Sequence, residues 1–133
     1  MRSISRDVMV IGSDSSERIQ SKNKWLPGGT VNIMFGQAAA LIRKRSEKRD
    51  FLGRWSSFIL EVNQKALMII TIYRIPDSTA LGILKSKAQY NRKYGVIKTT
   101  NEYRKILLKE IGNKIMEAKQ VGIDDILVSG DFN

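Results

Sequence analysis

Two neighbouring stretches decide the fold: Arg54-Trp55-Ser56-Ser57-Phe58-Ile59-Leu60-Glu61-Val62 and Lys65-Ala66-Leu67-Met68-Ile69-Ile70-Thr71-Ile72-Tyr73. Both are rich in β-branched and aromatic residues, which favour strands. Only Asn63-Gln64 separates them, so the sequence predicts a tight antiparallel hairpin. The second stretch is apolar at positions that would face both sides of a sheet. We therefore expect it to be covered on both faces, at the centre of a layered structure.

Working outward from the hairpin, three further stretches have the composition of short strands: Asp7–Gly12, Val31–Gly36 and Asp125–Ser129. The clearest helix is Asn101–Gln120, whose apolar residues recur at helical spacing. Thr99 and Glu102 make a capping box at its start. A shorter helix is expected near Lys85–Lys93. Because a strand, a helix and a strand follow one another, the last strand is expected to run parallel to an earlier one. The predicted fold class is α/β.

The composition limits the chemistry. The 133 residues make one domain at most, and they include no Cys and no His. Disulfides, Cys/His zinc sites and Ser-His-Asp catalysis are therefore excluded within this chain. A metal would need oxygen ligands, which is typical of Mg²⁺, Mn²⁺ or Ca²⁺. No apolar run is long enough for a membrane span. These features favour a soluble intracellular protein with no membrane partner; whether it is nuclear stays open.

The charge points to a polyanionic partner. Lys+Arg number 23 and Asp+Glu number 13, which gives a net charge of +10 and favours nucleic acid. The densest basic run lies within Arg43–Asp50, a segment that we expect to be exposed throughout. Arg43, Lys44 and Arg45 are candidates for contacts with nucleic-acid phosphates. The alternative is a solvated segment without a partner.

Polar side chains follow two of the predicted strands. Asp131 and Asn133 come after the last strand; the first could orient a water or hold a metal, and the second could bind a phosphate oxygen. An Asx turn that closes the strand is the alternative. Tyr73 and Arg74 end the central strand, and a phenol beside a guanidinium suits phosphate recognition. The alternative is a tyrosine at the rim of the core and an arginine in solvent.

Taken together, the motifs resemble the endonuclease/exonuclease/phosphatase family, and more narrowly the apurinic-endonuclease-like domains of non-LTR retroelements. The residues that carry the resemblance are Trp25-Leu26-Pro27-Gly28-Gly29-Thr30, Leu52-Gly53-Arg54-Trp55, Ile70-Thr71-Ile72-Tyr73-Arg74-Ile75-Pro76 and Ile126-Leu127-Val128-Ser129-Gly130-Asp131-Phe132-Asn133. Each motif is short, but their order and spacing form a fairly specific series. The resemblance implies a four-layer α/β sandwich, of which residues 1–133 would be a part.

The resemblance also implies phosphodiester hydrolysis with Mg²⁺ or Mn²⁺. Asp131 and Asn133 match the family's Asp-x-Asn pair, and Tyr73 matches its strand-end tyrosine. The family's late Asp-His pair and early metal-binding Glu have no match here, so the metal ligands stay unknown and the domain is expected to be incomplete at both ends. The implied substrate is nucleic acid, DNA in preference to RNA, with fusion to a reverse transcriptase in a longer protein. A non-catalytic nucleic-acid-binding module and a phosphodiesterase acting on inositol phosphates or sphingomyelin are the alternatives.

Overall fold

The structure is a computed structural model that describes residues 8–13, 29–74, 76, 81–96 and 99–132. Its strands are β1 (Val8–Ser13), β2 (Thr30–Phe35), β3 (Lys48–Arg49), β4 (Trp55–Val62), β5 (Lys65–Tyr73) and β6 (Asp125–Asp131). Its helices are α1 (Gln37–Ala40), α2 (Leu81–Tyr94) and α3 (Thr100–Gln120). The expectations for Trp25–Gly28 and Asn133 lie outside the described residues.

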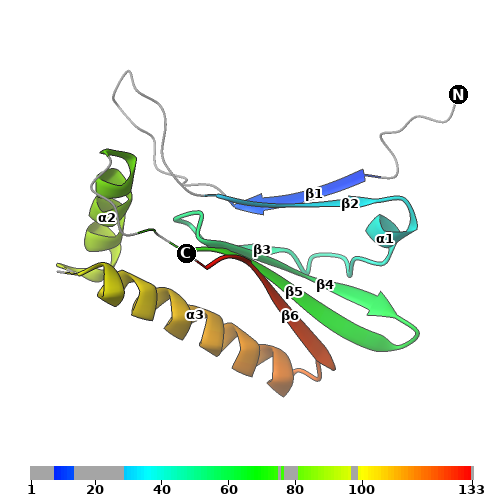
Figure 1. Cartoon of the computed structure of the whole chain (residues 1–133). Coiled ribbons are helices and arrows are strands. Elements are labelled where there is room, and N and C mark those ends of the chain that lie inside the picture. Colours follow the sequence, from blue (N-terminus) through cyan, green and yellow to red (C-terminus); the bar gives the residue numbers. More distant parts are fainter. Residues whose placement is uncertain (1–7, 14–28, 75, 77–80, 97–98, 133) are drawn as a thin grey trace, which may run out of the picture.

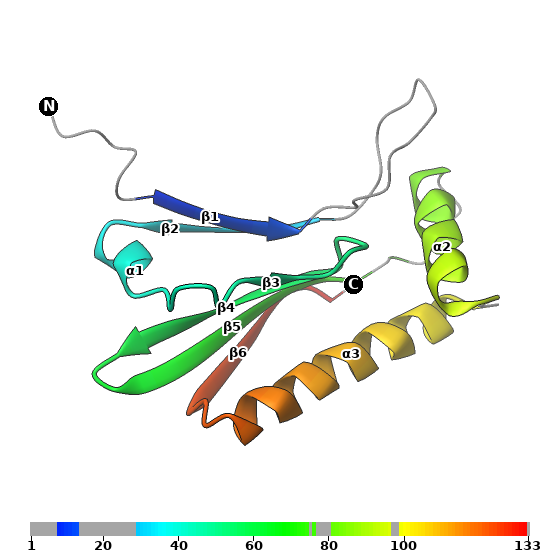
Figure 2. The same cartoon turned by 180° about the vertical axis from the view of Figure 1, so that it is seen from behind.

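The described elements form a layered α/β arrangement. One sheet has the order β3-β4-β5-β6, in which β5 and β6 are parallel and the other neighbours antiparallel. The second sheet is the antiparallel pair β1-β2. It lies over one face of the larger sheet, while α3 runs across the other face and α2 stands at one end (Figures 1 and 2). The predicted partial α/β sandwich is confirmed.

The expected hairpin forms as the sequence predicts. Trp55 pairs with Ile72, Val62 pairs with Lys65, and Asn63 and Gln64 make the turn with φ values of 49° and 66°. Positive φ at both turn positions is what the tightest hairpin turns require, and asparagine tolerates it well. The neighbour of β5 on its other side is β6, in parallel, which confirms the predicted crossover.

Alternation along the strands gives the larger sheet two apolar faces. The face toward α3 contains Trp55, Ala66, Met68, Ile70 and Ile72, which pack with Leu107, Ile111, Ala118 and Ile123. The face toward β1 and β2 contains Phe58, which packs with Ile11 and Ile42. The central strand β5 is thus covered on both sides, as expected.

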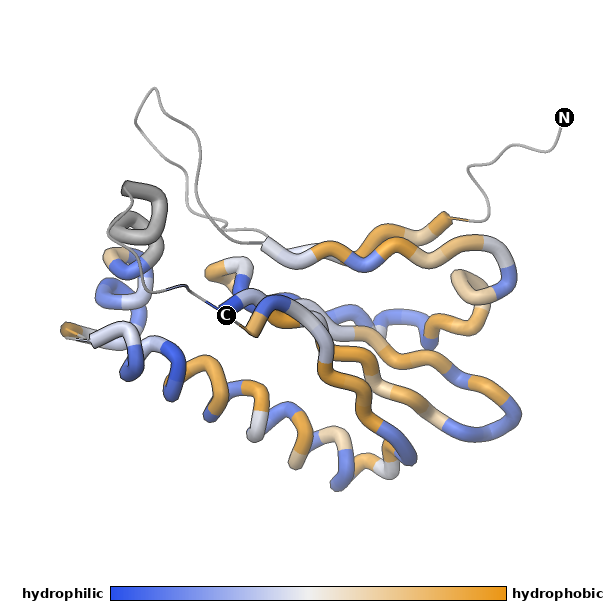
Figure 3. Tube along the Cα trace, in the orientation of Figure 1, coloured by the Kyte–Doolittle hydropathy of each residue, from blue (hydrophilic) through white to orange (hydrophobic). Residues whose placement is uncertain are grey.

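Helix α3 has the start and the end that its sequence predicts. Thr99 accepts a hydrogen bond from the Glu102 backbone, and the Glu102 side chain accepts one from the Thr99 backbone. After the last turn, Gly122 has a φ of 80°, the left-handed conformation that favours glycine. Hydrophobic and hydrophilic residues alternate along the helix (Figure 3), and the apolar ones pack on the sheet.

Two local expectations needed correction or extension. The charged segment Arg43–Asp50 is not exposed throughout, because Asp50 is only 5% exposed. The reason is that Lys48 and Arg49 pair with β4 as strand β3 and carry the chain into the interior. Helix α2 begins at Leu81 and is longer than the predicted Lys85–Lys93. Within the described ranges, no helix is long and apolar enough to cross a membrane.

Candidate active site at the strand ends

The candidate site begins with Tyr73 and Asp131, which are direct neighbours in the register of β5 and β6. Neighbouring strands lie about 4.8 Å apart, and paired residues of parallel strands point to the same face. Here it is the face toward β1 and β2, since Ile69, four residues before Tyr73, packs in the core on that side. Tyr73 is half-buried and Asp131 is exposed. A phenol and a carboxylate therefore lie side by side at the carboxyl ends of two parallel strands.

Gly130 allows β6 to approach β5 at this point. Its φ is 140°, and a Cβ atom there would lie 1.9 Å from the Ile72 carbonyl oxygen. A larger residue would therefore have to displace the backbone. The glycine that precedes Asp131 thus sets how closely the carboxylate approaches Tyr73.

Arg74 ties the two strand ends together. Its backbone N–H donates to the Asp131 carbonyl at 3.0 Å, and its Nη1 donates to the Phe132 carbonyl at 2.8 Å. A guanidinium has five N–H donors, so these bonds leave further donors for another acceptor. The structure places the predicted phosphate-binding arginine next to Tyr73 and Asp131, where it also has a structural role.

A polar network lies between the two sheets on the same face as Tyr73. Asn32 of β2 donates through Nδ2 to the Ser56 hydroxyl at 3.0 Å and accepts a hydrogen bond from Thr71 through Oδ1. Thr30 and Ser56 share a further hydrogen bond of 2.7 Å. Because Thr71 is two residues before Tyr73, this network fixes β2 beneath the strand ends.

A buried arginine lies next to Tyr73 of the candidate site. Arg54 is 0% exposed, and its guanidinium carbon lies 5.6 Å from the centre of the Tyr73 ring and 5.7 Å from that of Tyr90. Burial lowers the pKa of Arg54, while Tyr90, Tyr73 and Asp50 act in the opposite direction. Arginine is the most basic side chain and stays charged in proteins. The fold therefore places a cation beside the tyrosine.

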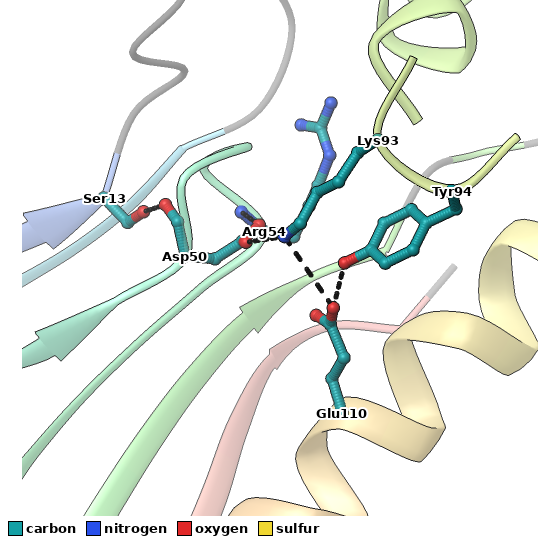
Figure 4. A network of polar contacts seen from close by, with 6 residues as sticks. All are labelled: Ser13, Asp50, Arg54, Lys93, Tyr94 and Glu110. Carbon is teal, nitrogen blue, oxygen red and sulfur yellow. Dashed lines mark hydrogen bonds and ion pairs between the residues drawn. The ribbon is translucent and has the colours of Figure 1, made fainter. Parts of the chain in front are cut away.

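Asp50 anchors the turn that leads to Arg54. Its Oδ2 accepts from the Arg54 backbone N–H at 3.1 Å, and its carbonyl accepts from the Ser13 hydroxyl at 2.6 Å. Lys93 of α2 lies 3.5 Å from Asp50 Oδ1 and 3.9 Å from Glu110 Oε1. Tyr94 also donates to Glu110, which completes a row of polar groups from β1 to α3 (Figure 4). This row joins both helices to the start of β4.

A cleft of about 280 Å³ lies beside this row, on the α3 side of the sheet. Its charged lining residues are three cations and three carboxylates: Arg49, Lys93, Lys114, Asp50, Glu110 and Glu117. Because these charges balance, the cleft has no net attraction for a polyanion. Tyr73 faces the opposite side of the sheet, so this cleft is separate from the strand-end site.

The basic run Arg43, Lys44 and Arg45 lies toward the other end of β4. Arg43 donates from its backbone to the Ile59 carbonyl at 2.8 Å, whereas Tyr73 donates to the Arg54 carbonyl. Five residues of strand separate these two points, which is about 17 Å. Arg43 also pairs with Glu61 at 2.6 Å, while Lys44 and Arg45 are exposed. The structure does not bring the basic run together with the strand-end residues.

The described part of the site does not by itself fit a divalent metal. Asp131 is the one carboxylate among the described side chains at the strand ends. No group of three or more metal-binding side chains occurs anywhere within the described residues. A hard divalent cation takes about six oxygen ligands. Further ligands would have to come from waters, substrate or residues other than those described.

Sequence reasoning missed three residues that build this region, namely Asn32, Asp50 and Arg54. Arg54 had two signals, since it is a cation at the start of an apolar strand and belongs to the Leu52-Gly53-Arg54-Trp55 motif. Asn32 had a similar signal, an amide at an inward position of β2. Asp50 had none, because it stands at the end of a run of exposed charges.

Comparison of the chain with protein-family models, with curated proteins and with solved structures finds no match.

Proposed function

We propose that this chain is part of a phosphodiesterase domain that hydrolyses nucleic acid, most specifically an endonuclease acting on DNA. The single observation that carries the proposal is the pairing of Tyr73 with Asp131 at the carboxyl ends of β5 and β6. The order and spacing of the sequence motifs support it, and so does the net charge of +10.

Each residue has a role that follows from its chemistry. The Asp131 carboxylate accepts a hydrogen bond from the attacking water and orients its oxygen toward phosphorus. The Tyr73 phenol donates to a non-bridging phosphate oxygen, and Arg74 offers remaining guanidinium donors to the same group. The water oxygen forms a bond to phosphorus and passes its proton to Asp131, while the bond to the leaving oxygen breaks and that oxygen takes up a proton from solvent. When bound, Mg²⁺ or Mn²⁺ would neutralise charge on the phosphate.

The second candidate is a nucleic-acid-binding module without catalysis. The chain contains no histidine, and one carboxylate lies at the described strand ends. Both facts favour binding without turnover, because a general base that titrates near neutrality is missing. Both candidates require a polyanionic partner, and they differ in turnover.

Plasmid cleavage tests the first candidate. The full-length protein is incubated with supercoiled plasmid and Mg²⁺, and the nicked form is quantified with and without EDTA. Asp131→Ala is expected to lower the rate by about 10²–10⁴, the usual contribution of a positioned acid or base. Asp125→Ala is the matched control, since Asp125 is an exposed carboxylate at the opposite end of the same strand.

Three outcomes would count against the proposal. Equal rates for the Asp131→Ala variant and the parent would remove Asp131 from the mechanism. Salt-dependent binding without cleavage in Mg²⁺ or Mn²⁺ would favour the binding module. Release of phosphate from inositol phosphates, or cleavage of sphingomyelin, without nicking would favour a different substrate class.

A further inference from the structure

We propose that Arg54 is a positioning residue that holds the Tyr73 ring in place through a buried cation–π contact. This inference rests on the proposed function for its consequence in catalysis, but the contact itself can be tested without turnover. Arg54 cannot touch a substrate directly because it is 0% exposed. Any effect it has on a phosphate must pass through a residue that it contacts.

The backbone first sets the two residues opposite each other. The Tyr73 N–H donates to the Arg54 carbonyl at 2.7 Å, which continues the antiparallel register of β4 and β5 by one pair. Side chains of directly opposed residues point to the same face and interact. The guanidinium carbon of Arg54 is 5.6 Å from the Tyr73 ring centre, within the range of a cation–π contact.

The guanidinium also lies beside Tyr90 of α2. Its ring centre is 5.7 Å from the Arg54 carbon, and the residue is 2% exposed. Tyr90 in turn meets Tyr103 of α3 edge to face at 5.3 Å. The guanidinium therefore contacts a ring of the site and a ring that both helices support. We call Tyr73, Arg54 and Tyr90 the Arg54 cluster.

Burial makes this contact stronger than an exposed one. A cation–π attraction gains strength when water is excluded from the pair. The Asp50 carboxylate lies in the same turn, where it accepts from the Arg54 backbone N–H and favours the charged form of the guanidinium. Figure 4 shows Asp50 and Arg54 next to each other at the start of β4.

A fixed ring is what the proposed role of Tyr73 needs. The side chain is half-buried at a strand end, and a phenol that donates to a phosphate oxygen has to be held within about 0.5 Å of its working position. A guanidinium is planar and rigid and contacts both rings at once, whereas a lysine ammonium is a compact charge on a flexible stem. Arg54→Lys therefore keeps the charge and removes the rigid group that holds the ring.

Nuclear magnetic resonance tests the contact between Arg54 and Tyr73 without a measurement of catalytic activity. 3-Fluorotyrosine placed at position 73 should give one sharp ¹⁹F signal in the parent and a shifted, averaged signal in Arg54→Lys. Lys114→Met is the control, because Lys114 makes a comparable contact with Trp55 at 5.8 Å on the other face of the sheet. An identical signal in parent and Arg54→Lys would overturn the proposal.

A reciprocal measurement covers the case in which Arg54→Lys does not fold. In Tyr73→Leu, the ¹⁵N–¹H signal of the Arg54 side chain should move, because the ring that shields it is gone. Lys114→Met should leave that signal in place. An Arg54 signal that does not change in Tyr73→Leu would show that the two side chains are not in contact.

Kinetics of the full-length protein then test the consequence. Arg54→Lys should lower kcat about tenfold or more with KM for DNA nearly unchanged, as expected when geometry rather than binding is lost. An unchanged kcat beside an altered ¹⁹F signal would overturn the positioning role and leave the proposed function standing. If the parent shows no cleavage, the proposed function fails, and the resonance experiment alone decides whether Arg54 holds the ring.

Discussion

Tyr73 and Asp131 occupy paired positions in adjacent parallel strands, although α2 and α3 lie between them in the sequence. The phenol and the carboxylate therefore depend on how closely β6 approaches β5. Gly130 makes that approach possible, since a Cβ atom would lie 1.9 Å from the Ile72 carbonyl oxygen.

Gly130→Ala should accordingly destabilise the fold by at least about 2 kcal/mol, through backbone strain and displacement of β6. Urea unfolding measures the difference. Gly122→Ala is the matched control, because Gly122 also has a positive φ but a Cβ atom there would meet nothing within 4 Å. We expect its cost to be about 1 kcal/mol, because alanine is disfavoured at positive φ. Equal costs for the two variants would contradict the close approach of the strands.

Binding to duplex DNA should weaken steeply with salt. Each neutralised phosphate contributes about −0.9 to the slope of log K against log salt concentration. Lys44→Glu/Arg45→Glu should reduce this slope if the basic run binds phosphates. The control is Lys105→Glu/Lys109→Glu, which makes the same charge change on exposed positions of α3. Equal losses in both pairs would assign the effect to net charge alone.

Because the basic run and Tyr73 are separated along β4, the affinity for DNA should depend on the length of the duplex. At about 3.4 Å per base pair, five base pairs span the roughly 17 Å of strand between them. Fluorescence anisotropy with duplexes of increasing length should show the Lys44 and Arg45 contribution only beyond that length. A contribution that is already complete in the shortest duplex would place the contact elsewhere.

Asp50→Ala should cost about 1–3 kcal/mol, because it leaves the buried Arg54 N–H without its acceptor. Chemical denaturation of the variant measures this loss. Glu61→Ala removes an acidic partner from an exposed ion pair with Arg43 and should cost less than about 1 kcal/mol. If the two variants lose equal stability, Asp50 is not the anchor of the turn.

Stability should fall in alkali because of two tyrosines. Burial raises the pKa of Tyr90 and of Tyr94, and for Tyr94 the bond to Glu110 adds to the effect. In the unfolded chain these phenols ionise near pH 10, while in the folded chain they stay protonated. The free energy of unfolding therefore has its highest value below about pH 10, and it decreases as the pH rises further. Tyr90→Phe/Tyr94→Phe should flatten this decrease in urea titrations, and an unchanged slope would argue against it.

The features that sequence reasoning recovered are those determined by nearby residues. The β4-β5 hairpin follows from two apolar stretches and a two-residue turn, and α3 follows from its spacing and capping box. The parallel course of the last strand was predicted, whereas the register that makes Tyr73 and Asp131 neighbours came from the structure. The position of Asp50 could not be predicted in this way, because its surroundings include Ser13 of β1 and Lys93 of α2, which two distant parts of the chain bring to it.

The two-residue turn at Asn63 and Gln64 also bears on the order of folding. A hairpin that closes so locally forms within about 1–10 μs, so Tyr73 and Arg54 can meet early. Asp131 reaches its position beside Tyr73 only after α3 has packed and β6 has paired with β5, because contacts between distant parts of a chain form more slowly. We expect substitutions along β6 to accelerate unfolding more than they slow folding. The Asp131 carboxylate would then be the last group of the site to take its position during folding and the first to lose it during unfolding.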